Sequence, residues 1–127
     1  MILLDTHILL SALGQVDLVL PLAMQKELSS NLNASISVAS IWEIAIKNRS
    51  GKMNLTLPIN KLSTLITKQN ISILNIVADH TCANIGPEPV TKDPFDRLLL
   101  GVCASESMKL LTIDRALISH PLAWREH

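Results

Sequence analysis

Five acidic residues could bring their carboxylates to one site, four of them beside predicted strand ends or helix starts and one on the polar side of a predicted helix. They are Asp5, Glu43, Asp93, Asp96 and Asp114. Carboxylates that lie close together repel one another, and some stay protonated unless a cation compensates their charge. Oxygen ligands without a His or Cys partner suit Mg²⁺ or Mn²⁺ better than Zn²⁺. A magnesium centre can activate water and stabilise an in-line phosphoryl displacement, so these residue types point to metal-assisted phosphodiester hydrolysis.

The stretch Lys92–Asp96 has the pattern of a charged turn that enters an apolar helix. Asp93 suits the N-cap, Pro94 the first helical position and Asp96 the third. Apolar residues then recur at helical spacing and predict a helix over residues 95–108. Its buried face is predicted to consist of Phe95, Leu98, Leu99, Val102 and Cys103. The two acids could instead serve the helix alone, Asp93 as its cap and Asp96 as a charge favoured by the helix dipole.

Short apolar segments alternate with amphipathic ones along the chain. Strands are predicted at residues 2–4, 34–37, 71–77 and 110–113, and helices at residues 7–13, 21–30, 38–47, 58–69, 78–85 and 95–108. A short helix at residues 115–118 and a surface tail over residues 121–127 follow. This alternation predicts one α/β domain over residues 1–127, a three-layer sandwich whose central, mostly parallel sheet is flanked by helices.

Two of the acids directly follow predicted strands. Asp5 comes after residues 2–4, and Asp114 comes after residues 110–113. Parallel sheets bind ligands outside the carboxyl ends of their strands, near a switch in strand order. If these two strands are neighbours, both carboxylates project from that edge. The loop to Asp93 must cross the same edge, because the helix after it runs back along the sheet. The alternative for Asp5 and Asp114 is a local role in a turn or N-cap.

The helix over residues 38–47 is apolar around much of its circumference. Its buried stripe is predicted to contain Val38, Ile41, Trp42 and Ala45, with Ser37 or Ser40 as the cap. Its polar line consists of Ser40, Glu43 and Lys47. Glu43 could therefore reach the acidic site from the side. It could equally form no more than an i,i+4 ion pair with Lys47.

The composition excludes several classes of protein. Apolar residues make up 48% of the 127 residues, too many for a disordered chain, and eleven basic and eleven acidic side chains cancel. Three aromatic residues are too few for a platform that stacks a single strand. Cys82 and Cys103 have no zinc-finger spacing, and no segment has the pattern of a signal peptide or a membrane span. A soluble, cytoplasmic protein without membrane contact is expected.

Four segments carry a resemblance to a known family. In chain order they are Ile2-Leu3-Leu4-Asp5-Thr6-His7, Ser40-Ile41-Trp42-Glu43-Ile44-Ala45-Ile46-Lys47, Lys92-Asp93-Pro94-Phe95-Asp96-Arg97-Leu98-Leu99 and Leu111-Thr112-Ile113-Asp114. Together they extend across nearly the whole chain and resemble the PIN domain. More narrowly, they resemble the VapC-type toxins of type II toxin–antitoxin modules.

The resemblance implies a Mg²⁺- or Mn²⁺-dependent endoribonuclease. Its catalytic residues and metal ligands would be Asp5, Glu43, Asp96 and Asp114, with Asp93 of the same motif as a further candidate ligand. Relatives are commonly homodimers that a cognate antitoxin holds inactive by blocking the acidic cleft. RNA, an antitoxin and a second copy are therefore the expected partners. One departure is Thr91, which stands where relatives often have His and so bears on the contacts that the His would make.

Two further interpretations stay open. The basic residues near the motifs could bind an RNA backbone or could be ordinary solvated surface. They are Lys47, Arg49, Lys52, Lys92, Arg97 and Arg115. Lys47 and Arg97 could equally be internal counter-charges for the acids. The alternative function is a non-catalytic PIN-like module that binds RNA or protein, although a complete set of mutually repelling acids argues against it.

Overall fold

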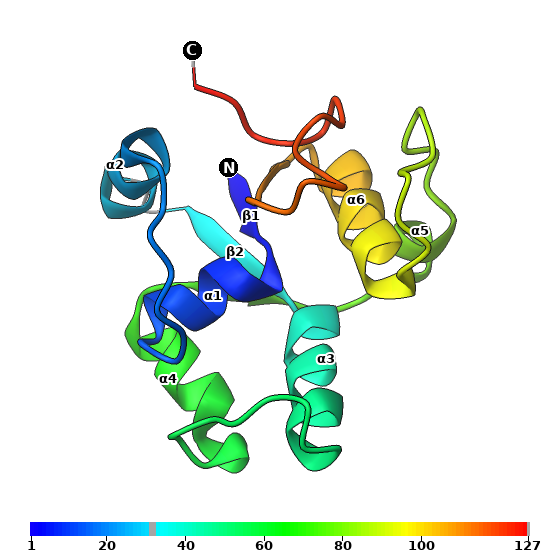
Figure 1. Ribbon diagram of the computed structural model, residues 1–127. Coiled ribbons are helices and arrows are strands. Elements are labelled where there is room, and N and C mark those ends of the chain that lie inside the picture. Colours follow the sequence, from blue (N-terminus) through cyan, green and yellow to red (C-terminus); the bar gives the residue numbers. More distant parts are fainter. Residues whose placement is uncertain (31–32, 127) are drawn as a thin grey trace.

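The computed structural model describes residues 1–30 and 33–126 as strands alternating with helices (Figure 1). The strands are β1 (Ile2–Leu4), β2 (Ala34–Ser37), β3 (Ser72–Leu74) and β4 (Lys109–Leu111). The helices are α1 (Thr6–Ala12), α2 (Leu22–Ser30), α3 (Val38–Arg49), η1 (Ile59–Lys61), α4 (Leu62–Lys68), α5 (Ala78–Cys82) and α6 (Pro94–Glu106). All four predicted strands are therefore present, and each predicted long helix has a counterpart.

The four strands form one parallel sheet in the order β3-β2-β1-β4. β1 lies between β2 and β4, with Leu3 paired to Ser35 on one side and to Leu110 on the other. The central strands β1 and β2 are buried along their whole length, which explains why β1 is a continuous apolar run. The chain moves outward from β1 through β2 to β3 and then returns to the other side of β1. The predicted switch in strand order thus lies between β1 and β4.

Alternate residues of β1 face two different helical layers. Ile2 and Leu4 pack in a core cluster with residues of α1 and α4, including Ile8 and Ile66. Leu3 points to the other side of the sheet, where the second cluster contains buried residues of α6. These are Leu99, Leu100, Val102 and Cys103. Figure 1 shows α1, α2 and α4 on one side and α5 and α6 on the other, which confirms the α/β sandwich with a parallel sheet between helices.

The predicted orientation of α3 is wrong. Trp42, placed on the buried stripe, is 57% exposed, whereas the buried residues of α3 are Ala39, Ser40, Glu43 and Ile44. The helix is rotated so that its polar line of Ser40 and Glu43 faces inward. Hydrophobic periodicity missed this rotation because α3 has apolar residues around most of its circumference, so several faces fit a buried stripe about equally well.

Two predictions for the last segment are also wrong. Residues 115–119 form turns instead of a helix. The tail expected at the surface pairs with β4 instead, because Leu110 N donates to Leu122 O and Trp124 N donates to Leu110 O, both at 2.8 Å. Ala123 is buried in this bridge, while His127 lies outside the described residues. The tail therefore covers the backbone edge that β4 would otherwise expose.

Smaller differences concern element ends and single side chains. Ser37, and not Ser40, caps α3 by accepting from Ala39 N at 3.0 Å. In α2, Leu22 is 64% exposed, whereas Met24 and Leu28 pack against the first core cluster. None of the described helices is long and apolar enough to cross a membrane.

Candidate active site

The switch point between β1 and β4 places two aspartates at one edge of the sheet. Asp5 directly follows β1, and its backbone N–H donates to Leu111 O at 3.0 Å, which extends the pairing with β4. Asp114 follows three residues after the end of β4. A pocket of about 230 Å³ at this edge is lined by Asp5, His7, Leu18, Ile113 and Asp114. The arrangement expected from parallel neighbouring strands is therefore present.

Asp5 is nearly buried, with 6% of its surface exposed. Its Oδ1 accepts from Thr6 N at 2.8 Å and caps α1, and its Oδ2 accepts from Thr112 Oγ1 at 2.6 Å. Burial raises the pKa of the Asp5 carboxyl, and the nearby Asp114 charge raises it further. The two hydrogen bonds and His7 oppose this shift. Asp5 is thus an N-cap, as one interpretation held, but it also faces the charge of Asp114.

The hydroxyl of Thr112 links the two aspartates at the switch point. It donates to Asp5 Oδ2 and accepts from Asp114 N at 3.0 Å. Asp114 is exposed, and its Oδ1 accepts from Ala116 N at 2.9 Å, so it also holds the turn after β4. One oxygen of this carboxylate is therefore engaged locally, as a turn residue would be. Its charge still reaches Asp5 across the pocket.

The start of α6 brings in the second pair of aspartates. Asp93 is the N-cap, with Oδ1 accepting from Phe95 N at 2.9 Å, and Pro94 is the first helical residue, as predicted. Asp96 lies in the first turn. Thr91 joins the pair, because its Oγ1 accepts from Asp93 N at 3.1 Å and donates to Asp96 Oδ2 at 3.2 Å. The residue that departs from the family pattern is thus part of the acidic group in this chain.

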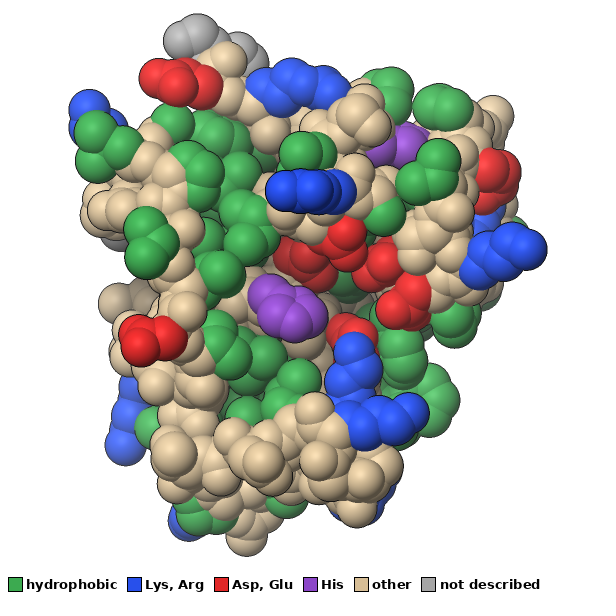
Figure 2. All heavy atoms as spheres, viewed as in Figure 1, with side chains coloured by type: hydrophobic (Ala, Val, Ile, Leu, Met, Phe, Trp, Pro, Cys, Tyr) green, Lys and Arg blue, Asp and Glu red, His purple; other side chains and the backbone are tan. Residues whose placement is uncertain are grey.

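The pKa of Asp96 shows that the two pairs of aspartates share one region. It is raised to about 7, first by burial and then by the charges of Asp93, Asp5 and Asp114. The Thr91 hydrogen bond lowers it. Asp5 and Asp114 lie far from Asp96 in the sequence and at the ends of different strands, so their influence reflects tertiary proximity. Figure 2 shows acidic side chains gathered in a hollow near the middle of this face.

Glu43 reaches the same end of the sheet from α3, but its carboxylate is already engaged. It is 6% exposed, its Oε1 accepts from Thr6 Oγ1 at 2.7 Å, and its Oε2 pairs with Lys47 Nζ at 2.8 Å. The i,i+4 ion pair expected as the local alternative is therefore present. Lys47 also interacts with the charges of Asp93 and Asp96, and its pKa is raised mainly by the hydrogen bond with Glu43. Lys47 is thus an internal counter-charge for the acidic group.

Arg97, the other proposed counter-charge, contacts different partners. Its guanidinium donates to Ala83 O at 3.3 Å and to Glu88 Oε1 at 3.4 Å. These partners belong to the segment before α6 and not to the acidic group. Arg97 therefore fastens that segment to the helix.

A divalent cation fits the charge and chemistry of the aspartates. Asp5, Asp96 and Asp114 offer oxygen donors, and none of the three forms an ion pair with another described residue. In residues 1–30 and 33–126, no three His, Cys, Asp or Glu side chains gather closely enough to ligate one ion. Mg²⁺ often binds through one or two carboxylates while keeping several waters, so it does not need a preformed cage. The group fits a hydrated ion of this kind.

Sequence reasoning missed the hydroxyls that connect the acids. Thr6, Thr91 and Thr112 each contact a carboxylate of the group. A pattern that could have revealed two of them is Thr-x-Asp, which occurs at residues 91–93 and 112–114. In both, the threonine hydroxyl accepts the N–H of the aspartate two residues later, a local turn of known type. The same hydroxyl is then free to donate to an acid elsewhere in the fold.

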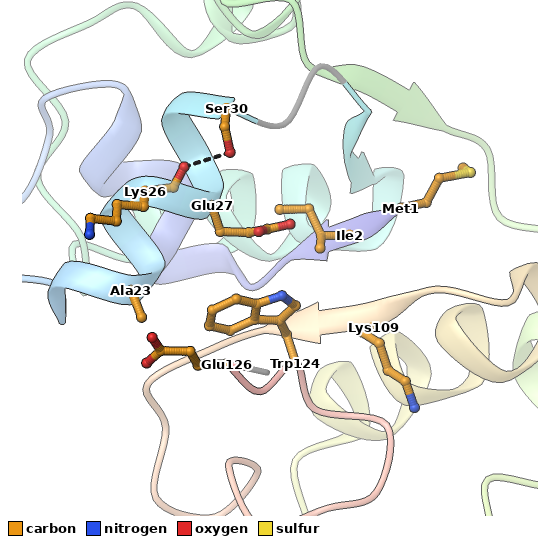
Figure 3. A pocket seen from close by; sticks show the side chains of 9 residues that line it. All are labelled: Met1, Ile2, Ala23, Lys26, Glu27, Ser30, Lys109, Trp124 and Glu126. Atoms are coloured by element: carbon orange, nitrogen blue, oxygen red, sulfur yellow. Dashed lines mark hydrogen bonds between the residues drawn. The ribbon is translucent and has the colours of Figure 1, made fainter.

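A separate pocket of about 430 Å³ lies at the opposite edge of the sheet (Figure 3). Its lining includes Met1, Ile2 and Lys109, which stand at the amino ends of β1 and β4. α2 and Trp124 of the tail form other parts of the wall. This pocket is therefore distinct from the acidic hollow at the carboxyl ends of the strands.

The fold and the acidic edge together define an α/β sandwich with a carboxylate-lined hollow at the switch point of a parallel sheet. The sequence matches the PIN domain over residues 2–121, and the chain belongs to the PIN domain family. Proteins of this family are generally nucleases and use divalent metal ions, so nuclease-type chemistry is the function class of this chain. A comparison with curated proteins gives no significant match.

Proposed function

We propose that the protein is a Mg²⁺- or Mn²⁺-dependent endoribonuclease. The observation that carries this proposal is the Asp96 carboxyl, whose pKa of about 7 reflects burial and the charges of three other aspartates. The part of this shift that comes from the neighbouring aspartates is relieved when a cation binds between the carboxylates. The cleft concentrates negative charge, and the chain belongs to a family of nucleases. A cation site for phosphodiester hydrolysis explains both facts.

Each acid of the group has a role in this proposal. One or two of the carboxylates of Asp5, Asp96 and Asp114 would bind the ion directly and the others would bind its waters, while Asp93 would support Asp96 from the cap of α6. A bound Mg²⁺ or Mn²⁺ supplies an activated water and stabilises the negative charge of the phosphodiester. Glu43 would complete the catalytic set from α3 while Lys47 limits its repulsion with the aspartates. Hydrolysis then forms a bond between water oxygen and phosphorus and breaks one ester bond of the RNA chain.

The biological setting follows from the resemblance to VapC-type toxins. We propose that this protein is the toxin of a toxin–antitoxin module, acts in the cytoplasm, forms a homodimer and is inhibited by a cognate antitoxin. An antitoxin that covers the acidic hollow would prevent RNA from reaching the aspartates. These proposals rest on the four motif segments and on the exposed position of the hollow (Figure 2).

The test is cleavage of an unstructured RNA that is labelled and blocked at both ends, so that exonucleases cannot degrade it. With Mg²⁺ or Mn²⁺ we expect internal cleavage, with EDTA none, and with Asp5→Asn a loss of at least about 100-fold. The matched control is Asp79→Asn, which removes an exposed acid of α5 outside the acidic group and should leave cleavage unchanged. Equal cleavage by wild type and Asp5→Asn would contradict the proposal.

One observation favours a second candidate, a PIN-like module that binds RNA or protein without cutting. Both oxygens of Glu43 are engaged by Thr6 and Lys47, which leaves this acid poorly placed to act on a substrate. This alternative predicts that RNA binds equally well with and without Mg²⁺ and remains intact. The same end-blocked RNA, analysed for binding as well as for products, distinguishes the two functions.

A further inference from the structure

Trp42 is exposed beside the acidic group, contrary to its predicted burial. It lies on α3 immediately before Glu43 and has 57% of its surface exposed. A tryptophan gains most from burial, so an exposed one next to a candidate active site calls for a partner outside the chain. Single exposed apolar residues are common on protein surfaces. The surroundings of Trp42 therefore decide whether its position has a function.

The ring of Trp42 is held by a second aromatic residue at the acidic group. Phe95 lies 5.7 Å from it between ring centroids, with an interplanar angle of 72°, so the pair is edge-to-face. Phe95 precedes Asp96 on α6 and is half-buried against the second core cluster. Trp42 and Phe95 thus join α3 to α6, and each stands next to an acid of the group. Figure 2 shows apolar side chains bordering the acidic hollow where α3 and α6 lie.

The charges of α3 distinguish between two kinds of partner. Arg49 is exposed two turns after Trp42, and therefore on the same side of α3. Aromatic rings combined with basic side chains are the usual means of binding single-stranded nucleic acid, because bases stack while cations contact phosphates. Trp42 also stands beside Glu43 and contacts Phe95, which precedes Asp96, so its exposed ring lies at the candidate catalytic acids. This position, together with Arg49 on the same side of α3, favours a nucleic acid strand as the partner of Trp42.

We propose that Trp42 stacks on an unpaired base of the RNA next to the scissile phosphodiester. This inference rests on the proposed function and adds a residue, Trp42, that contacts a base of the RNA. A base in a duplex is stacked on its neighbours and cannot present its face to Trp42. Phe95 fixes the ring from one side and leaves the exposed part of Trp42 for the base. The scarcity of aromatic residues still argues against a platform for several bases, so one stacked base is the expected contact.

Tryptophan fluorescence tests this contact directly, because the chain has only two tryptophans. The variant Trp124→Phe emits from Trp42 alone, and the variant Trp42→Phe emits from Trp124 alone. Trp124 lines the pocket at the opposite edge of the sheet, away from the acidic group (Figure 3). Unstructured RNA should quench Trp42 and leave Trp124 unchanged, and duplex RNA of the same composition should quench neither. The signal is read on mixing, in EDTA and in Mg²⁺, before products accumulate. Equal quenching by duplex RNA, or no quenching of Trp42, would overturn the proposal.

A substitution series separates stacking from apolar burial. Loss of one stacked base weakens binding by about 5- to 150-fold, so we expect Trp42→Leu and Trp42→Ala to bind RNA about tenfold more weakly and Trp42→Phe to retain most affinity. Leu22→Ala, another exposed apolar residue, is the control and should bind like wild type. If Trp42→Leu binds as well as Trp42→Phe, or if Trp42→Ala changes the sedimentation of the protein, the residue serves a protein interface and stacking is wrong.

These results can be told apart from failure of the nuclease proposal. Quenching of Trp42 by single-stranded RNA that is never cut would support stacking and contradict the nuclease. Metal-dependent cleavage with unchanged binding in Trp42→Ala would support the nuclease and overturn stacking.

Discussion

Two threonine hydroxyls order the aspartates of the candidate site. Thr91 and Thr112 each accept an N–H from the aspartate two residues later and donate to another carboxylate, Asp96 or Asp5. These hydrogen bonds lower the pKa of their acceptors, while burial and neighbouring charges raise it. The opposing effects leave Asp96 with a pKa of about 7, within the range where both stability and metal binding depend on pH.

The raised pKa of Asp96 predicts the sign of a pH effect in metal-free protein. The folded protein holds the Asp96 proton more tightly than the unfolded chain does, so this contribution to stability is complete below about pH 4 and is lost as the pH rises through 7. Solvent screening of this half-buried group limits the loss to about 1 kcal/mol. Asp96→Asn should therefore raise the melting temperature at pH 8 by roughly 3–6 °C and flatten its dependence between pH 5 and 8.

Thermal scans in EDTA across this pH range measure the effect. Asp79→Asn, which removes an exposed acid of α5, provides the comparison and should retain the slope of wild type. A slope that persists in Asp96→Asn would show that another group titrates instead.

Metal binding should stabilise the protein through Asp5. Wild type is expected to melt higher with Mn²⁺, because the ion binds the folded state and offsets the carboxylate repulsion. Asp5→Asn should lose most of that increase and should melt at least as high as wild type in EDTA, because Asn is also a good N-cap for α1. Differential scanning calorimetry with and without Mn²⁺ checks both statements. If Mn²⁺ stabilises both proteins equally, Asp5 is not a ligand.

At the scale of elements, α6 is positioned by its close contact with α5. Gly101 faces the backbone of α5, and a Cβ at this position would overlap the carbonyl oxygen of His80. His80 is buried, and its Nε2 lies 2.8 Å from Glu106 Oε1 near the end of α6. The two helices are therefore locked together, and this packing holds the first turn of α6, with Asp93 and Asp96, at the edge of the sheet.

Gly101→Ala should separate α5 from α6. The overlap is with backbone, which cannot rotate away, so we expect the free energy of unfolding to fall by about 3 kcal/mol, or the variant not to fold.

Ser107→Gly, at the end of the same helix, should instead stabilise the protein. Ser107 has a left-handed backbone conformation with φ 55° that glycine adopts without strain. That variant should gain about 1 kcal/mol. Urea unfolding of both variants provides the test, and a well-tolerated Gly101→Ala would contradict the packing.

At the scale of the whole molecule, the C-terminal segment closes one edge of the sheet. Trp124 packs against the first core cluster and Leu122 against the second, so the tail connects both helical layers across β4. Arg125 strengthens the connection by donating to the carbonyl oxygens of Ile118 and His120, both at 3.4 Å. Apolar packing and hydrogen bonds therefore hold this segment against β4.

Deletion of residues 121–127 should destabilise the protein by several kcal/mol. It removes two backbone hydrogen bonds to β4 and the apolar burial of Leu122, Ala123 and Trp124. Deletion of residues 126–127 alone retains these contacts and should have little effect. Thermal unfolding of the two truncated proteins measures the difference. Equal melting temperatures would show that the tail does not support the sheet.

The candidate site was predictable to the extent that it depends on local rules. Asp93 as a cap follows from the residues of its own turn, and Asp5 and Asp114 could be placed together because parallel strands end at a common edge. The hydrogen bond from the Thr6 hydroxyl to the Glu43 carboxylate was not predictable, since it joins residues 37 positions apart. The role of Thr112 was missed because its hydroxyl donates to Asp5, 107 positions away. The bond of Thr91 with Asp96 spans only five positions, but it depends on how the turn before α6 folds.

The sequence by itself determined the order of strands and helices, the class of the fold and the acids that stand at strand ends and helix starts. These features follow from residue periodicity, capping and turn chemistry, which act over a few neighbouring residues. Tertiary structure decided the rotation of α3, the exposure of Trp42, the pairing of the tail with β4 and the shared electrostatics of the four aspartates. Each of these depends on contacts between segments far apart in the chain, which local patterns do not specify.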